Sequence, residues 1–185
     1  DLLGANTATG AIALTSVDAL AAGQNLTLPL GSSVQSTGSS VTLNAGDNAT
    51  IAGNITSALA PTINVDFGDA ESPAVIALVT GSGATLLITG VITTPAVGSG
   101  GGAFLNGNDD VDTFNFSPQT STEFRVNGNA PAAADVPTNF DTLILNIAST
   151  TNPNLTVPGS IAPYNGSGSG SWGFTSAHLP VLYTN

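Results

Sequence analysis

Short apolar runs alternate with small and polar residues along the whole chain. Segments such as Val41–Leu43 and Thr85–Thr89 are rich in Val, Leu, Ile and Thr, and Gly, Asn, Asp or Pro bounds most of them. Runs of this length and composition predict β-strands rather than helices. We predict strands at Ala11–Thr15, Asn25–Leu28, Val41–Leu43, Ala49–Ile51, Thr62–Phe67, Ala74–Thr80, Thr85–Thr89, Val91–Thr94, Thr113–Phe116, Thr122–Val126, Thr142–Ile147, Leu155–Val157, Ser171–Thr175 and Val181–Tyr183.

The first half of the chain repeats a short unit in which a brief strand ends at a small or polar corner. Val41–Asp47, Ala49–Asn54 and Thr85–Gly90 all have this form. Short strands, tight corners and stacked polar residues are typical of a parallel β-helix, or solenoid. We therefore predict an all-β fold that is solenoid-like for most of its length. An antiparallel β-sandwich with short strands is the alternative.

A glycine-rich segment at residues 98–102 separates two parts of different composition. Residues 1–100 form the solenoid-like segment, and charged and aromatic residues become more frequent after it. Residues 101–185 are a β-rich continuation with an acidic loop and an aromatic C-terminal strand. Glycine clusters of this kind mark loops or corners, so we expect the two parts to form one continuous structural unit.

The charge balance excludes several classes of function. The 185 residues include 1 Lys or Arg against 12 Asp or Glu, and the net charge is −11. A single Arg cannot neutralise a run of phosphates, which excludes nucleic acid as a partner. No stretch reaches the roughly 18 uninterrupted apolar residues of a membrane span. With one His and no Cys, the chain is poorly supplied for catalysis, and we predict that it is not an enzyme.

One acidic loop carries the ligand types that calcium prefers. Carboxylate and amide oxygens are dense between Asn106 and Asp112, and calcium takes about six to eight oxygen ligands. A solvated acidic turn is the alternative interpretation. No cofactor is required elsewhere in the chain. The candidate calcium ligands are Asn108, Asp109, Asp110 and Asp112.

Two further sets of residues are candidates for contact with sugars. Tyr164 and Trp172 would stack on sugar rings if exposed, whereas packing into a core at the end of the molecule is the alternative. The Asn-x-Ser/Thr motif marks candidate acceptors for N-linked glycans. For the remaining polar residues, we predict that His178 lies at the edge of a strand and that Arg125 forms a local ion pair with Glu123. The candidate acceptors are Asn25, Asn48, Asn54, Asn115, Asn154 and Asn165.

The order of motifs in the second half resembles a known class of surface protein. The chain reads LNGNDDVDTFNF at Leu105–Phe116, EFRVNGNAP at Glu123–Pro131 and FDTLILNI at Phe140–Ile147. This order is similar to repeat modules of very large bacterial surface proteins of the filamentous-haemagglutinin or adhesin type, which are frequent in planctomycetes and cyanobacteria. The resemblance implies a β-solenoid at an extracellular or cell-surface location.

We therefore expect a non-enzymatic structural subunit or repeat of an extracellular filament, stalk or surface layer. Open strand edges pair with other chains unless Lys or other charges block them, and such residues are nearly missing. The expected partner is the protein itself, with Asp1–Thr15 as a donated strand and Leu179–Tyr183 as the acceptor edge. The alternative function is an adhesin or carbohydrate-binding domain that calcium stabilises and that binds a polysaccharide.

Overall fold

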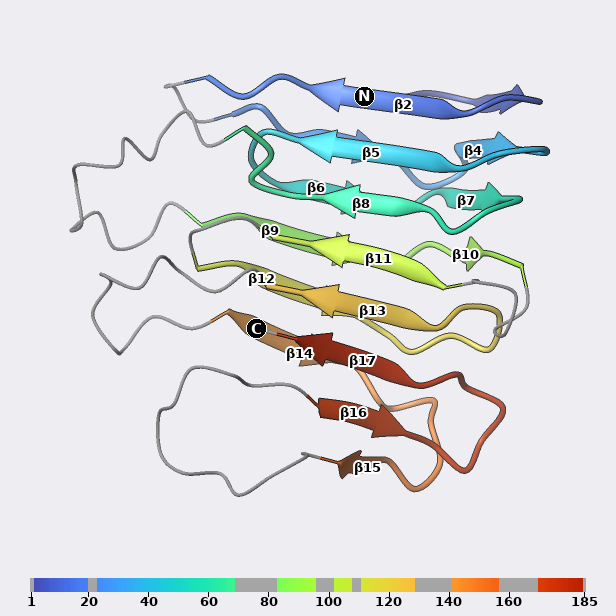
Figure 1. The fold of residues 1–185 in the computed structure, drawn as a ribbon, viewed down its shortest axis with the longest axis vertical. Coiled ribbons are helices and arrows are strands. Elements are labelled where there is room, and N and C mark those ends of the chain that lie inside the picture. Colours follow the sequence, from blue (N-terminus) through green and yellow to red (C-terminus); the bar gives the residue numbers. More distant parts are fainter. Residues whose placement is uncertain are drawn as a thin grey trace.

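The computed structural model is an all-β protein whose strands lie in three sheets (Figure 1). It describes residues 2–19, 23–68, 83–95, 102–107, 111–128, 141–156 and 170–184. These ranges contain seventeen strands and no helix, and hence no helix that could cross a membrane. The predicted all-β class is confirmed for this part of the chain. The strand predicted at Ala74–Thr80 lies outside the described residues.

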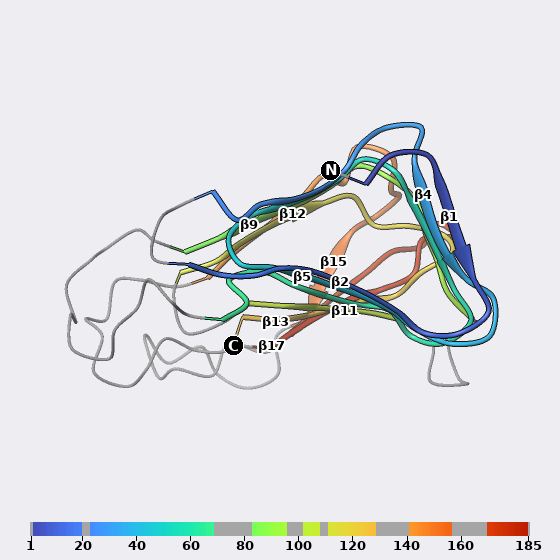
Figure 2. The same ribbon diagram turned by 90° about the horizontal axis from the view of Figure 1, so that it is seen from above.

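The chain visits the three sheets in rotation. β1 (Ala5–Ala8) lies in sheet A, β2 (Ile12–Ser16) in sheet B and β3 (Leu26–Leu28) in sheet C. We call one such passage a circuit, and in Figure 2 the successive circuits superimpose as three walls around a shared interior. The next three circuits consist of β4 (Ser33–Ser36), β5 (Val41–Ala45), β6 (Ala49–Ile51), β7 (Asn54–Ser57), β8 (Thr62–Asn64), β9 (Thr85–Ile88), β10 (Ile92–Thr93), β11 (Ala103–Asn106) and β12 (Thr113–Phe116).

Successive circuits pair in parallel and in register. In sheet B, Leu14 lies beside Leu43 and Leu43 beside Ile63. In sheet C, Thr27 lies beside Thr50. Because side chains alternate between the two faces of a strand, an inward residue stacks on the inward residue of the next circuit. The outward residues form columns in the same way.

The order changes in the last part of the chain. β13 (Phe124–Asn127) and β14 (Thr142–Leu145) extend sheets B and C, whereas sheet A ends at β10. Sheet B then continues through the final strand, β17 (Val181–Thr184), to β16 (Gly170–Gly173) and β15 (Asn154–Thr156). Only these last three strands pair antiparallel within the described residues. The sandwich alternative would need such pairing throughout.

The structure shows how the strands expected to accept and to donate, at Leu179–Tyr183 and Asp1–Thr15, are paired within the chain. β17 lies between β13 and β16 and has a neighbour on each side. The prediction that Leu179–Tyr183 offers an open acceptor edge is therefore wrong, because the chain itself fills both edges. At the other end, β1 and β2 pair with β4 and β5 of the same chain, so each of them keeps one open edge.

Stacked aliphatic side chains from all three sheets fill the interior. Ile55 of sheet A, Ile63 of sheet B and Ile51 of sheet C are all 0% exposed. Burying a side chain of this size contributes about 1.5–3 kcal/mol to folding. Larger rings enter the core in the later circuits, where Phe116 and Phe124 lie with their ring centroids 4.6 Å apart.

Three of the four strands of sheet A are ones that the hydrophobic pattern does not predict. β1, β4 and β7 read ANTA, SVQS and NITS. In β4 and β7, the buried residues next to Val34 and Ile55 are serines, Ser36 and Ser57, rather than aliphatic residues. Ser36 Oγ donates to the carbonyl of Gly10 at 2.7 Å, so its burial carries no unsatisfied hydroxyl. The pairing of neighbouring circuits, rather than an apolar alternation, defines this sheet.

A methyl group at Gly90 is predicted to disrupt the stacking of circuits. A Cβ there would lie 1.9 Å from the backbone oxygen of Gly53 in the preceding circuit, so the two corners would have to separate. We expect Gly90→Ala to lower the free energy of unfolding by about 2 kcal/mol or more, measured by urea denaturation. Gly10→Ala is the control, because a Cβ at Gly10 meets nothing within 4 Å. Equal losses in both variants would contradict the close stacking.

The single trypsin site is predicted to report global unfolding. The chain has 1 Lys or Arg, and this residue, Arg125, lies on β13 between β11 and β17. A protease needs an extended, unpaired segment, so cleavage requires β13 to leave the sheet. We expect native protein to resist trypsin and the cleavage rate to follow the unfolded fraction as urea is added. Rapid cleavage without denaturant would show that β13 opens locally.

Candidate assembly surface at the N-terminal end

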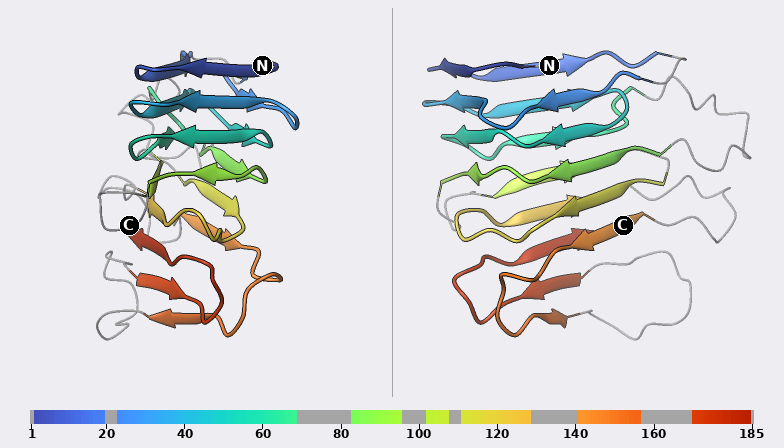
Figure 3. Two further views of the ribbon diagram at one scale, coloured as in Figure 1. Left: turned by 90° about the vertical axis from the view of Figure 1, so that its right-hand side faces the viewer. Right: turned by 180° about the vertical axis from the view of Figure 1, so that it is seen from behind.

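At one end of the molecule the stack ends on the first circuit. β1, β2 and β3 are the edge strands of sheets A, B and C, and the N–H of Leu2 donates to the carbonyl of Thr27 on β3. Figure 3 shows β1 and β2 in dark blue at the end of the stack. We call the open edges of these three strands, together with Leu2, the N-terminal face. The N-terminal face thus contains residues from all three sheets of the first circuit.

The hydrogen bonds of β2 show which backbone groups point out of this face. The N–H of Ile12 donates to the carbonyl of Ser40 at 3.0 Å, which fixes how β2 pairs with β5. Backbone groups alternate in direction along a strand, so the N–H and C=O groups of Ala13 and Thr15 point away from β5. The same alternation holds for β1. The residues of the two strands whose backbone N–H and C=O groups point out of the N-terminal face are Ala5, Thr7, Ala13 and Thr15.

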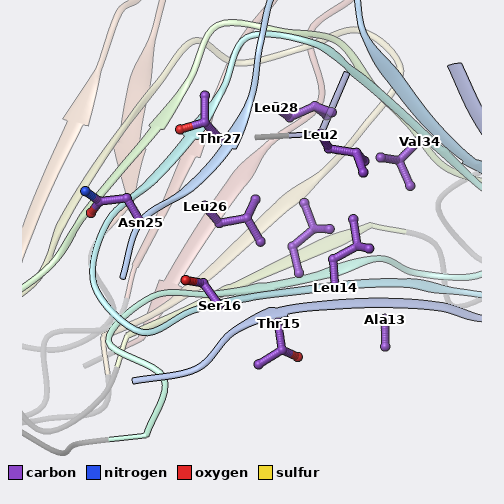
Figure 4. Close-up of a pocket in the computed structure, with 11 residues that line it drawn as sticks. Leu2, Ala13, Leu14, Thr15, Ser16, Asn25, Leu26, Thr27, Leu28 and Val34 are labelled. Atoms are coloured by element: carbon purple, nitrogen blue, oxygen red, sulfur yellow. The ribbon is translucent and has the colours of Figure 1, made fainter. Parts of the chain in front are cut away.

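An apolar cavity of about 390 Å³ lies at the N-terminal face (Figure 4). Leu14 of β2 and Leu26 of β3 line it from two sheets, and Leu2 contributes from the start of the chain. These three leucines are half-buried, whereas Leu28 and Leu43, which also line the cavity, are 1% exposed. The core is therefore closed within the stack and open at this end.

The N-terminal face is nearly free of charge. Asp18 is the only charged residue between Leu2 and Gly46, although the chain as a whole carries −11. Natural edge strands are commonly blocked by Lys, by Pro or by a bulge. The sequences of β1, β2 and β3 are ANTA, IALTS and LTL, with no charge and no Pro. Nothing on these strands opposes pairing with another strand.

The opposite end of the molecule is closed by aromatic side chains. Trp172 of β16, Phe174 and Tyr183 of β17 pack against the core. Sheet B also runs three strands past β14, the last strand of sheet C. Of the two candidate sugar-binding aromatics, Trp172 is thus a packing residue at this end, and Tyr164 lies outside the described residues. The sheets therefore end unevenly here, whereas at the N-terminal face each sheet ends on the first circuit.

The structure describes Asp112 alone among the candidate calcium ligands, since Asn108, Asp109 and Asp110 lie outside the described residues. Asp112 is 0% exposed. Its Oδ1 accepts the N–H of Ala84 at 2.8 Å, and its own N–H donates to Asp141 Oδ1 at 2.8 Å. Within the described ranges, no three His, Cys, Asp or Glu side chains are grouped closely enough to hold a metal. The visible role of Asp112 is to join neighbouring circuits.

The connection from sheet B to sheet C carries an aspartate in every circuit. The carboxylate of Asp47 accepts the N–H groups of Gly23 and Gln24, the latter at 2.8 Å. Such acceptors satisfy backbone donors where the sheet hydrogen bonds stop. Part of the acidic content is therefore structural. The residues of this column are Asp18, Asp47, Asp66, Asp112 and Asp141.

Asparagine amides connect the circuits along the outer face of sheet B. Asn64 Nδ2 donates to Asn44 Oδ1 at 2.7 Å, and Asn106 Nδ2 donates to Asn64 Oδ1 at 2.8 Å. Asn44 Nδ2 in turn donates to Thr15 Oγ1 at 3.1 Å. An amide can donate and accept at once, so this ladder continues from circuit to circuit. It reaches Thr15 on the N-terminal face.

Two candidate glycan acceptors, Asn25 and Asn48, lie at corners directly before β3 and β6, and Asn54 is the first residue of β7. Asn25, Asn48 and Asn54 are exposed, and Asn48 Nδ2 donates to Asn25 Oδ1 at 3.0 Å. A glycan on Asn48 Nδ2 would compete with this contact. Asn154 is exposed on β15 and Asn115 is half-buried on β12. Asn165 lies outside the described residues.

The polar side chains of the last circuits form local pairs. Arg125 Nε lies 2.7 Å from Glu123 Oε1, which confirms the predicted ion pair, and the guanidinium lies 5.5 Å from the ring centroid of Phe104. His178 Nδ1 lies 2.8 Å from Ser176 Oγ, in the connection between β16 and β17. No carboxylate of the described residues hydrogen bonds to His178, so these residues form no Ser-His-Asp relay.

No protein-family model, curated protein or solved structure matches the chain. The similarity to bacterial surface-protein repeats rests on the motifs of the second half, and it stays a prediction. The surface with the most distinctive physical properties is the N-terminal face, because it combines open strand edges with an uncovered core.

Removal of one buried charge is predicted to stabilise the protein at neutral pH. Desolvation raises the pKa of Asp141 from 3.8 to about 6, although the N–H of Asp112 opposes the shift. Ionising this carboxyl in the folded state therefore costs stability as the pH rises from 3.8 to about 6, and the loss is complete above that range. We expect Asp141→Asn, which retains an oxygen for Asp112, to raise the free energy of unfolding at pH 7 by about 1 kcal/mol.

Urea denaturation at several pH values checks this expectation. The two proteins should be equally stable near pH 3.5, where the wild-type carboxyl is protonated, and should diverge as the pH rises to about 6. A variant that is less stable than the wild type by the same amount at every pH would show that the Asp141 charge is not the cause.

Proposed function

We propose that the protein is a non-enzymatic structural subunit of an extracellular filament, stalk or surface layer, and that it assembles through its strand edges. The observation that carries this proposal is the N-terminal face. There the open edges of β1 and β2 lie next to an apolar cavity of about 390 Å³. A surface of this kind is stabilised when further β-strands cover it.

The fold that supports this function is a parallel β-helix, or solenoid. The strands follow the order A, B, C through four circuits, and they stack in parallel. In a solenoid each repeat contacts only its neighbours, and an end repeat without a cap leaves its apolar face uncovered. The last circuit has a cap of aromatic residues, whereas the first circuit has none among the described residues.

Assembly at this face combines two favourable terms. Covering the half-buried leucines removes apolar surface from water, at about 25 cal/mol per Å². Pairing the outward N–H and C=O groups of Ala13 and Thr15 with another strand adds direction and register. The face carries no charged edge residue that would oppose either term.

The composition favours an exposed and durable location. The chain has no Cys and no Met, the residues that oxidants attack most readily. Its one trypsin site lies within sheet B. These properties fit an extracellular structural role and add nothing to a catalytic one.

Electron microscopy and light scattering test the proposed function. We expect the wild-type protein to form particles of more than one chain, and the fraction of chains in such particles to rise with protein concentration. Ala13→Pro should abolish them, because proline removes an N–H that points out of the N-terminal face while the bond from Ile12 to Ser40 remains.

Retained resistance to trypsin at Arg125 is the control that the variant still folds. Wild-type protein that stays a single chain at high concentration would contradict the proposal. Unchanged assembly of a folded Ala13→Pro variant would show that the edge of β2 is not used.

A further inference from the structure

We propose that the partner at the N-terminal face is a second copy of this chain, joined face to face about a two-fold axis. In this arrangement the β2 strands of the two copies pair antiparallel, and sheet B continues from one copy into the other. The inference rests on the proposed function, because it names the partner of the same surface.

The distribution of charge favours contact between two N-terminal faces. Two chains of net charge −11 repel each other wherever their acids approach within a Debye length, about 8–10 Å. All acids except Asp1 and Asp18 lie between Asp47 and Asp141 in the sequence, so they belong to the later circuits. Contact between the first circuits brings two nearly neutral surfaces together. Side-by-side contact would instead bring the aspartate columns of the two copies close.

The apolar residues of the face are only partly covered in the single chain. β1, β2 and β3 contribute 4, 5 and 3 residues to its edge. Leu14 and Leu26 are only half-buried in the single chain. In the pair, the leucines of each copy cover the cavity of the other.

The way the sheets end decides between face-to-face and head-to-tail contact. At the N-terminal face every sheet ends on the first circuit, so no sheet runs far past the other two there. At the opposite end, sheet B runs three strands past sheet C, which is roughly 14 Å at about 4.8 Å per strand. A head-to-tail neighbour could therefore pair with β15 but would leave sheets A and C separated by a gap.

The strand β2 is the best-exposed edge of the face. It is the longest of the three edge strands, with 5 residues. The edge of β3 is partly covered, because the N–H of Leu2 donates to the carbonyl of Thr27 at 3.1 Å. A two-fold axis reverses the direction of the second copy, so β2 meets its own equivalent antiparallel. This makes the interface isologous, so the N-terminal face joins two copies, and growth of the pair into a filament or layer needs a second contact elsewhere on its surface.

Cross-linking of single-cysteine variants tests the arrangement, since the natural chain has no Cys. Thr15→Cys places a thiol on β2, Asn154→Cys places one on the exposed start of β15, and Thr62→Cys is the control on β8. A short bis-maleimide cross-linker accepts either register of the pair. We expect a covalent dimer with Thr15→Cys alone and none with either other variant alone.

Each outcome separates this inference from the proposed function. Sedimentation equilibrium of the uncross-linked wild type should give twice the chain mass of 18.1 kDa. A cross-link that forms only when Thr15→Cys and Asn154→Cys are mixed would overturn the two-fold pair and leave assembly through strand edges intact. A monomer at every concentration, with no cross-link in any variant, would overturn both.

Discussion

In-register pairing of parallel strands is the constraint on which the rest of this structure depends. It places every residue beside the equivalent residue of the next circuit, so each choice of side chain is repeated along a column. Leu14, Leu43 and Ile63 form such a column inside sheet B, while Asn44 and Asn64 form an amide ladder outside it. The corners must stack equally closely, which is why a Cβ at Gly90 has no room.

The same constraint gives the unusual charge balance a structural meaning. Backbone N–H groups lose their sheet partners at each corner, and buried donors need acceptors. Asp47, Asp112 and Asp141 supply carboxylate oxygens there, so an aspartate is used where other proteins use a backbone carbonyl or water. This accounts for part of the excess of acids over bases. It also creates the half-buried carboxyl of Asp141, whose pKa is raised by desolvation.

The two ends of the stack of circuits differ in how their strand edges and core residues are covered. At one end the antiparallel strands β15 and β16 follow β17, and Trp172 packs its ring against the core. This placement gives Trp172 a packing role in the cap and weakens the interpretation of a sugar-binding platform. At the other end Leu2 makes one hydrogen bond to Thr27 and leaves the edge of β2 open. The contrast between the ends is the basis of the proposed assembly.

The sequence by itself determined the strands of sheets B and C other than β11, because residues such as Val41, Leu43 and Phe114 alternate with polar ones. It also determined the ion pair of Arg125 with Glu123, which depends on local spacing alone, and the lack of charges that block a strand edge. It did not reveal β11 of sheet B. It also did not reveal β1, β4 and β7, whose polar residues gain strand structure only from neighbouring circuits. Only the tertiary structure decided that β17 lies between two strands and that the cavity is at the N-terminal face. The physical reason is that a local pattern shows which face of a strand is buried, whereas long-range pairing decides which strand lies beside it and which edge stays open.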